Sequence, residues 1–286
     1  MFVPLPIKSK IEVIPKKMVT HNWSNLFRDL VATVIADALG EHAFEFVAEL
    51  LCDKHGVKLL QETLRVHGCL EETYWICAFA VNQHAGICGA NPNGDIDPVT
   101  KIPHPTCACS APKFFNEDPP LNEHGESIQC EMNKFDDMMA FLSKKDNNFT
   151  EVIAVDADLN LFQRSWCIAE LAEAHRMGMA QNLMLRNKAT LMNRQCTLEG
   201  LQVENMKASR PEDVQQILAK IPDKKAFNKK LQELIFDGTT GLLASWKKAD
   251  VLQQMEDLSY VLKWARLSEL VEDGALIWRR WIAFAP

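Results

Sequence analysis

The sequence predicts an α/β protein, a parallel sheet with helical extensions at both ends of the chain. Two apolar runs, Tyr74–Val81 and Val152–Val155, are continuous and too short for typical helices, as in strands that are buried on both faces. Segments with helical spacing of apolar residues lie before, between and after these runs. Strands that alternate with helices in this way favour a parallel sheet.

Residues 1–70 are expected to form an arm followed by helices. Prolines and lysines interrupt every apolar patch of residues 1–20, which predicts an extended arm. Helical spacing then follows over three stretches: 22–39, 44–51 and 57–64. Gly40 stands where the first of these helices would stop. This segment would bury little on its own, so we expect it to pack on the main domain.

Residues 71–221 are expected to form the α/β domain. Besides the two apolar runs, helices are predicted over 135–142 and 166–177, with short strands over 183–185 and 201–203. Residues 209–213 predict a further helix start, with a capping serine, an early proline and acids in the first turn. Residues 82–130 form an insertion with little periodicity, in which seven prolines and four glycines fall between Gly86 and Gly125. An irregular segment of this length inside a compact domain requires a function, a metal or disorder.

Residues 222–286 are expected to form a C-terminal helical segment. Helical spacing over 226–236 stops at Gly238, and the pattern returns over 245–282.

Composition excludes several classes of protein. The chain has 31 Lys and Arg against 38 Asp and Glu, a net charge of −7, which argues against nucleic acid or anionic lipid as a partner. No apolar run is long enough to span a membrane, and the N-terminus lacks the continuous apolar core of a secretory signal. Nine cysteines without such a signal favour reduced thiols or metal ligands. We therefore expect a cytoplasmic protein.

Candidate binding residues gather where the two predicted strands end. Asp156 follows the second strand, and acids at this place contact ribose hydroxyls or cap the next helix. Trp166 and Glu170 are four residues apart and share a helix face, which suits a nucleotide or simple packing. Arg164 can pair with Glu170 or with a phosphate. Asn82 and His84 follow the first strand and are expected at the same edge.

The insertion also carries a candidate metal site. Cys88, Cys107, Cys109 and Cys130 supply four thiols, and His84 is an alternative fourth ligand. Such a set suits structural zinc, and a loop with so little apolar content would gain much of its order from the metal. Because the spacing is not a repeated C-x-x-C, reduced cysteines in an ordered loop are the competing interpretation.

The phrase WCIAEL, Trp166–Leu171, resembles the W-C-x-x-E-L signature of Toll/interleukin-1 receptor (TIR) domains. The order of motifs over Tyr74–Ile221 is similar to that of TIR-like proteins of unicellular eukaryotes. The matching pieces are a YWICAF strand followed by Asn-Gln-His, a V-x-D strand, R-x-W-C-x-x-E, and a D-x-x-x-I-L-x-x-I helix over Asp213–Ile221. The Cys- and Pro-rich insertion departs from a standard TIR domain, which has a short first loop and a clear second strand.

The resemblance implies a flavodoxin-like sheet and self-association. In catalytic members it also implies cleavage of NAD, as substrate, at the nicotinamide–ribose bond, and the catalytic glutamate of the signature maps onto Glu170. A carboxylate there would stabilise the oxocarbenium character of the ribose. The alternative is a non-catalytic signalling or assembly module that acts through self-association or protein partners, with an insertion held by zinc.

Overall fold

The computed structural model describes residues 14–80, 83–86, 88–89, 91, 94, 96–97, 99–112, 135–190, 198–208, 211–219 and 221–252. Within these residues four parallel strands form a sheet in the order β2-β1-β3-β4. The strands are β1 (Lys17–His21), β2 (Tyr74–Ile76), β3 (Thr150–Ala154) and β4 (Ala180–Met184). The α/β prediction is confirmed, and the strand order is the flavodoxin-like one.

The two central strands, β1 and β3, supply apolar side chains to both faces of the sheet. Val19 pairs with Val152 and both pack on one face, whereas Met18 and Ile153 pack on the other. This alternation follows from the two-residue period of a strand. Continuous apolar sequence at β3 is therefore explained by burial on both sides.

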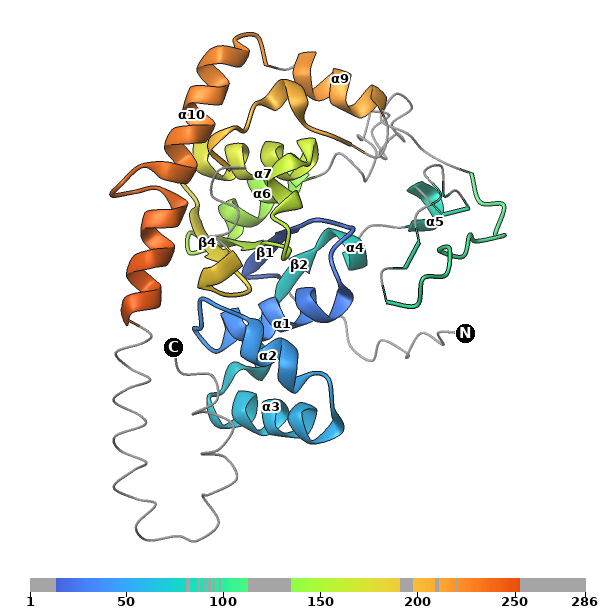
Figure 1. Cartoon of the computed structure of the whole chain (residues 1–286), viewed down its shortest axis with the longest axis vertical. Helices are drawn as coiled ribbons and strands as arrows, with labels where there is room; N and C mark the ends of the chain where they lie inside the picture. Colours follow the sequence, from blue (N-terminus) through green and yellow to red (C-terminus); the bar gives the residue numbers. More distant parts are fainter. Residues whose placement is uncertain are drawn as a thin grey trace, which may run out of the picture.

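Helices cover both faces and make a three-layer structure (Figure 1). One face carries α1 (Phe27–Ala38), α2 (Glu45–Leu50) and α3 (Lys54–Val66), whose buried residues pack on Val19 and Val152. The other face carries α6 (Phe135–Lys145), α7 (Ser165–Arg176), α9 (Pro211–Ala219) and α10 (Lys224–Phe236). The helices predicted in these regions are confirmed, and Gly40, with φ +79°, ends the turn after α1.

The prediction of an extended arm over residues 1–20 is wrong for residues 17–20, which belong to β1, a central strand. Met18, Val19 and Thr20 are fully buried. The charged Lys17 is compatible with a buried strand, because it is the first residue of β1 and its Nζ contacts Asp37 Oδ2 on α1 at 2.7 Å. Helices α1 to α3 therefore form the crossover from β1 to β2 rather than a separate prefix.

Two predicted strands are corrected. The strand over Tyr74–Val81 is limited to β2, and α4 (Cys77–Ala80) follows at once. Because β2 lies at the edge of the sheet, it is not enclosed on both sides, and Tyr74 and Trp75 are half-buried. The predicted short strand over 201–203 is wrong, since Val203–Asn205 form a 3-10 turn.

The insertion and the C-terminal segment are described in part. The described insertion includes the short helix α5 (Gln83–Gly86) and the irregular residues 99–112. Residues 242–252 are helical, as predicted for the start of the last segment, and residues 253–286 lie outside the described residues. Among the described residues no helix is both long and apolar enough to cross a membrane.

Candidate functional site

The strand order creates a switch point between β1 and β3. The chain leaves β1 toward β2 on one side, and it leaves β3 toward β4 on the other. Open α/β sheets bind ligands at the carboxyl ends of the strands where the order reverses in this way. The loops that follow β1 and β3 therefore frame the candidate site, and they carry Asn22 and Asp156.

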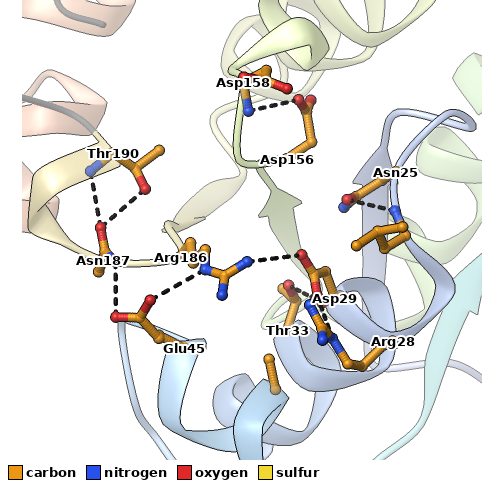
Figure 2. Close-up of polar contacts among 12 residues, drawn as sticks. Asn25, Arg28, Asp29, Thr33, Glu45, Asp156, Asp158, Arg186, Asn187 and Thr190 are labelled. Carbon is orange, nitrogen blue, oxygen red and sulfur yellow. Dashed lines mark hydrogen bonds and ion pairs between the residues drawn. The ribbon is translucent and has the colours of Figure 1, made fainter. Parts of the chain in front are cut away.

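Asp156 holds the loop after β3. Its Oδ1 accepts a hydrogen bond from the backbone N–H group of Asp158 (Figure 2). The same oxygen accepts one from the N–H group of Asn160, and Oδ2 accepts one from that of Leu161. Asn22 Nδ2 lies 3.5 Å from Oδ2 and links the two loops. The carboxylate is buried and engaged by these donors, so its role in the structure is to fix the loop, the capping alternative of the sequence analysis.

A cavity of about 190 Å³ opens at the switch point. Six described residues of polar type line it: Asn22, Ser24, Asn160, Gln163, Arg164 and Lys207. Backbone pairing fixes its basic wall, because Ser165 N–H donates to Lys207 O at 2.9 Å and Lys207 N–H donates to Gln163 O at 2.8 Å. Of the residues predicted for ligand binding, Arg164 lines this cavity, and Lys207 was not predicted.

Glu170 lies half-buried on α7, toward the ends of β1 and β2. Burial is the main cause that raises the pKa of the Cys77 and Cys167 thiols, and the negative charge of the nearby Glu170 is the second. The pKa of Cys77 is raised to about 12. Cys167 Sγ donates to His21 O at 3.5 Å, which places it against the end of β1. Glu170 therefore stands beside the carboxyl edge of the sheet.

Trp166 lies in the packing between α6 and α7. Its half-buried ring packs against a cluster that includes Met18, Met139 and Leu142. This is the packing alternative for Trp166, and it fixes the first turn of the helix that carries Glu170.

A charged network that the sequence did not indicate fills the end of β4 (Figure 2). Arg186 Nε donates to Glu45 Oε1 at 3.2 Å, and its Nη1 lies 3.8 Å from the buried Asp29. Arg28 Nη2 lies 2.8 Å from Asp29, and Asn187 Nδ2 donates to Glu45 at 2.8 Å. Both arginines face carboxylates, so this end of the sheet is a structural junction of α1, α2 and β4.

The insertion brings together His84, Cys88, Cys107 and Cys109, whose ligand atoms all lie within 4.8 Å of one another. Cys88 Sγ lies 3.3 Å from His84 Nδ1 and 3.4 Å from Cys109 Sγ. The pKa of Cys109 is lowered to about 6, mainly by the hydrogen bond from the backbone N–H group of Ala111 and secondly by the hydrogen bond with Cys88. This group could hold a metal ion.

Three of the four predicted cysteines therefore meet, and His84 takes the fourth place as the alternative ligand. His84 lies in α5, four residues before Cys88, and at this spacing the two side chains lie on the same side of the turn. His84 accordingly joins the cysteines instead of the ligand edge of the sheet. Cys130 and Asn82, the other predicted residues, lie outside the described residues.

A larger hollow of about 410 Å³ lies between residues 199–204 and α10. Its lining mixes acids and bases, Glu199 and Glu204 with Lys225 and Lys229, and no predicted site residue is part of it. We assign it no function, because its lining carries both acidic and basic side chains and so favours neither an anion nor a cation.

The chain was compared with known proteins. No protein-family model, curated protein or solved structure matches it. The comparisons therefore leave the function to the geometry of the site.

Proposed function

We propose that the protein binds a nucleotide at the carboxyl edge of its sheet and cleaves NAD at the nicotinamide–ribose bond, with Glu170 as the catalytic carboxylate. The observation that carries the proposal is the placement of Glu170, half-buried on α7 beside the ends of β1 and β2. Its sequence context resembles the TIR signature whose glutamate is catalytic. A half-buried carboxylate keeps access to a ligand while its field is less screened than on an open surface.

The chemistry requires little more than this carboxylate and a water molecule, which adds to the ribose carbon as nicotinamide leaves and then gives up a proton to solvent. Departure of nicotinamide builds positive charge on the ribose, and a fixed negative charge nearby stabilises that transition state. The leaving group is already cationic, so no general acid is needed. The neighbouring Cys77 remains a thiol at neutral pH because its pKa is about 12, and it does not compete as a nucleophile.

Nicotinamide release from NAD by the purified chain tests the proposal. We expect release by the wild type and a loss of about a hundredfold or more in Glu170→Gln, as for other residues that stabilise charge in a transition state. Glu173→Gln is the matched control, because Glu173 is on the same helix and its carboxylate is paired with Arg176. Equal rates in wild type and Glu170→Gln would contradict the proposal.

The alternative is an assembly module, and one observation favours it. Phe27 and Phe79 are 68% and 61% exposed, and their rings meet edge to face at 6.1 Å. Exposed aromatic pairs of this kind serve in protein interfaces. Light scattering tests this alternative, with Val66→Ala, an exposed position on α3, as the control for Phe27→Ala. The assembly function replaces the enzymatic one if only Phe27→Ala abolishes self-association and the wild type releases no nicotinamide.

We also propose that the insertion binds structural zinc. Three sulfur atoms and one nitrogen atom are a common zinc set, and ligand atoms that all lie within 4.8 Å of one another can surround a single ion. Four protein ligands leave no open position for a substrate. The ion would tie α5 to residues 107–109, and the free thiols suit the reducing cytoplasm.

A further inference from the structure

We infer that the cavity between the loops after β1 and β3 is a subsite for a phosphoryl group of the ligand. The inference rests on the proposed function, because it assigns one part of the same nucleotide. The residues that line the cavity follow the carboxyl ends of the neighbouring parallel strands β1 and β3, with Lys207 added from a later segment.

The charge of the lining selects an anion. Arg164 and Lys207 contribute two cations, and the other four lining residues carry amides or a hydroxyl. Among the residues that the structure describes, no carboxylate lines the cavity. The buried Asp156, in the loop after β3, directs both oxygens to backbone N–H groups and to Asn22. Arg164 is also the residue that precedes the first turn of α7, where the helix dipole favours negative charge.

One side chain of the lining and the backbone of its basic wall are held in place before a ligand arrives. Asn22 Oδ1 accepts from Ser24 N–H at 3.1 Å, which orients the amide of Asn22. The backbone bonds between residues 163–165 and Lys207 hold the two cationic residues on one wall. The amide of Asn22 and the backbone of this wall therefore lose little entropy when a ligand binds.

Size limits what the cavity holds. Sites for whole small molecules span about 300–1,000 Å³, whereas this cavity measures about 190 Å³. It therefore accommodates a charged group of a ligand, with the remainder of the ligand outside. Glu170 stands six residues beyond Arg164, about 9 Å along the helix axis. Cys167, between them, is subject to the charges of both residues.

This arrangement suits a ligand whose phosphate and reacting sugar carbon are several bonds apart, as in a nucleotide.

The comparison of nicotinamide mononucleotide with nicotinamide riboside tests the subsite, because the two differ only by the 5′-phosphate. By calorimetry we expect the wild type to bind the mononucleotide at least tenfold more tightly than the riboside. In Lys207→Gln the difference should fall below threefold. Lys207→Arg should retain it, and so should Lys188→Gln, which removes an exposed lysine just beyond β4. Equal affinities for both ligands in the wild type would overturn the inference.

Inorganic pyrophosphate separates this inference from the proposed function. If the wild type releases no nicotinamide but binds pyrophosphate, and Lys207→Gln weakens that binding at least tenfold, the subsite is supported and the catalytic proposal fails. If nicotinamide is released while pyrophosphate binds wild type and Lys207→Gln alike, the catalytic proposal stands and the subsite is overturned.

Discussion

The Sγ atom of Cys77 lies 3.5 Å from Nε2 of His21, where β2 and β1 end. The indole N–H of Trp23 donates to the same sulfur at 3.2 Å. Burial raises the pKa of Cys77 to about 12 and lowers the pKa of His21. At neutral pH this is a thiol beside a neutral imidazole, so the contact packs the edge of the sheet next to Glu170 and does not form a nucleophile.

Alkylation should distinguish the cysteines. At pH 7.5 a pKa near 12 leaves a thiolate fraction about a thousandfold below that of an ordinary thiol. We therefore expect iodoacetamide to modify Cys77 at least a hundredfold more slowly than the exposed Cys52. Mass spectrometry of peptides measures the two rates. Modification of both cysteines at similar rates would show that Cys77 is an accessible thiolate.

Substitution of Asp156 should destabilise the fold. In Asp156→Asn one acceptor oxygen becomes an N–H donor that faces backbone donors of the loop. Loss of buried hydrogen bonds of this kind costs about 1–3 kcal/mol. The free energy of unfolding in urea measures it, with the exposed Asp158→Asn as control. An unchanged stability of Asp156→Asn would mean that the loop does not depend on this carboxylate.

Glu151 should make stability depend on pH. It is fully buried in β3, where Thr20 Oγ1 and Gln181 Nε2 donate to it at 2.6 and 2.7 Å, and burial raises its pKa. Because the folded state holds this proton more tightly than the unfolded state, Glu151 lowers stability as the pH rises from about 4.5 through the folded pKa. Glu151→Gln cannot titrate.

The stability of Glu151→Gln relative to wild type should therefore increase with pH across this window, measured by urea unfolding between about pH 4.5 and 8. Glu173→Gln provides the opposite case, because pairing with Arg176 lowers the pKa of Glu173. That carboxylate stabilises the fold above its unfolded pKa, and the stabilisation is lost as the pH falls through the folded pKa. A difference for Glu151→Gln that is constant with pH would contradict the assignment.

Metal analysis tests the Cys/His cluster. We expect one zinc per chain in protein purified under reducing conditions, and its loss in Cys88→Ser and Cys109→Ser. Cys52→Ser, which removes an exposed thiol outside the cluster, should retain zinc. A chelator should lower the melting temperature of the wild type, since metal binding orders the insertion. Absence of zinc combined with no uptake of added zinc would reject the site.

Much of the fold followed from periodicity. The helices from α1 to α10 that carry regular apolar spacing, and the continuous apolar strand β3, were predicted because burial on one or both faces leaves a local signal. β1 was missed because KMVTH contains no apolar run. Its side chains are buried by the helices on the two faces of the sheet, and its edges are covered by β2 and β3, all of which lie elsewhere in the sequence.

The candidate site was predictable only where its residues were close together in sequence. Arg164, Trp166 and Glu170 share one segment, and Cys107 and Cys109 are separated by one residue. Lys207 reaches the cavity through backbone pairing with residues 163 and 165, for which the sequence offers no signal. The network of Asp29, Glu45 and Arg186 joins three separate segments and was missed for the same reason.

The location of the ligand is the central claim, and hydrogen–deuterium exchange with and without NAD tests it most directly. For the non-turning-over Glu170→Gln variant, we predict slower exchange in the loops over residues 22–26 and 156–165 and in the residues around Lys207. Exchange of residues 199–204 and of α10, which line the other hollow, should not change. Protection at that hollow, or none at the carboxyl ends of β1 and β3, would contradict the account.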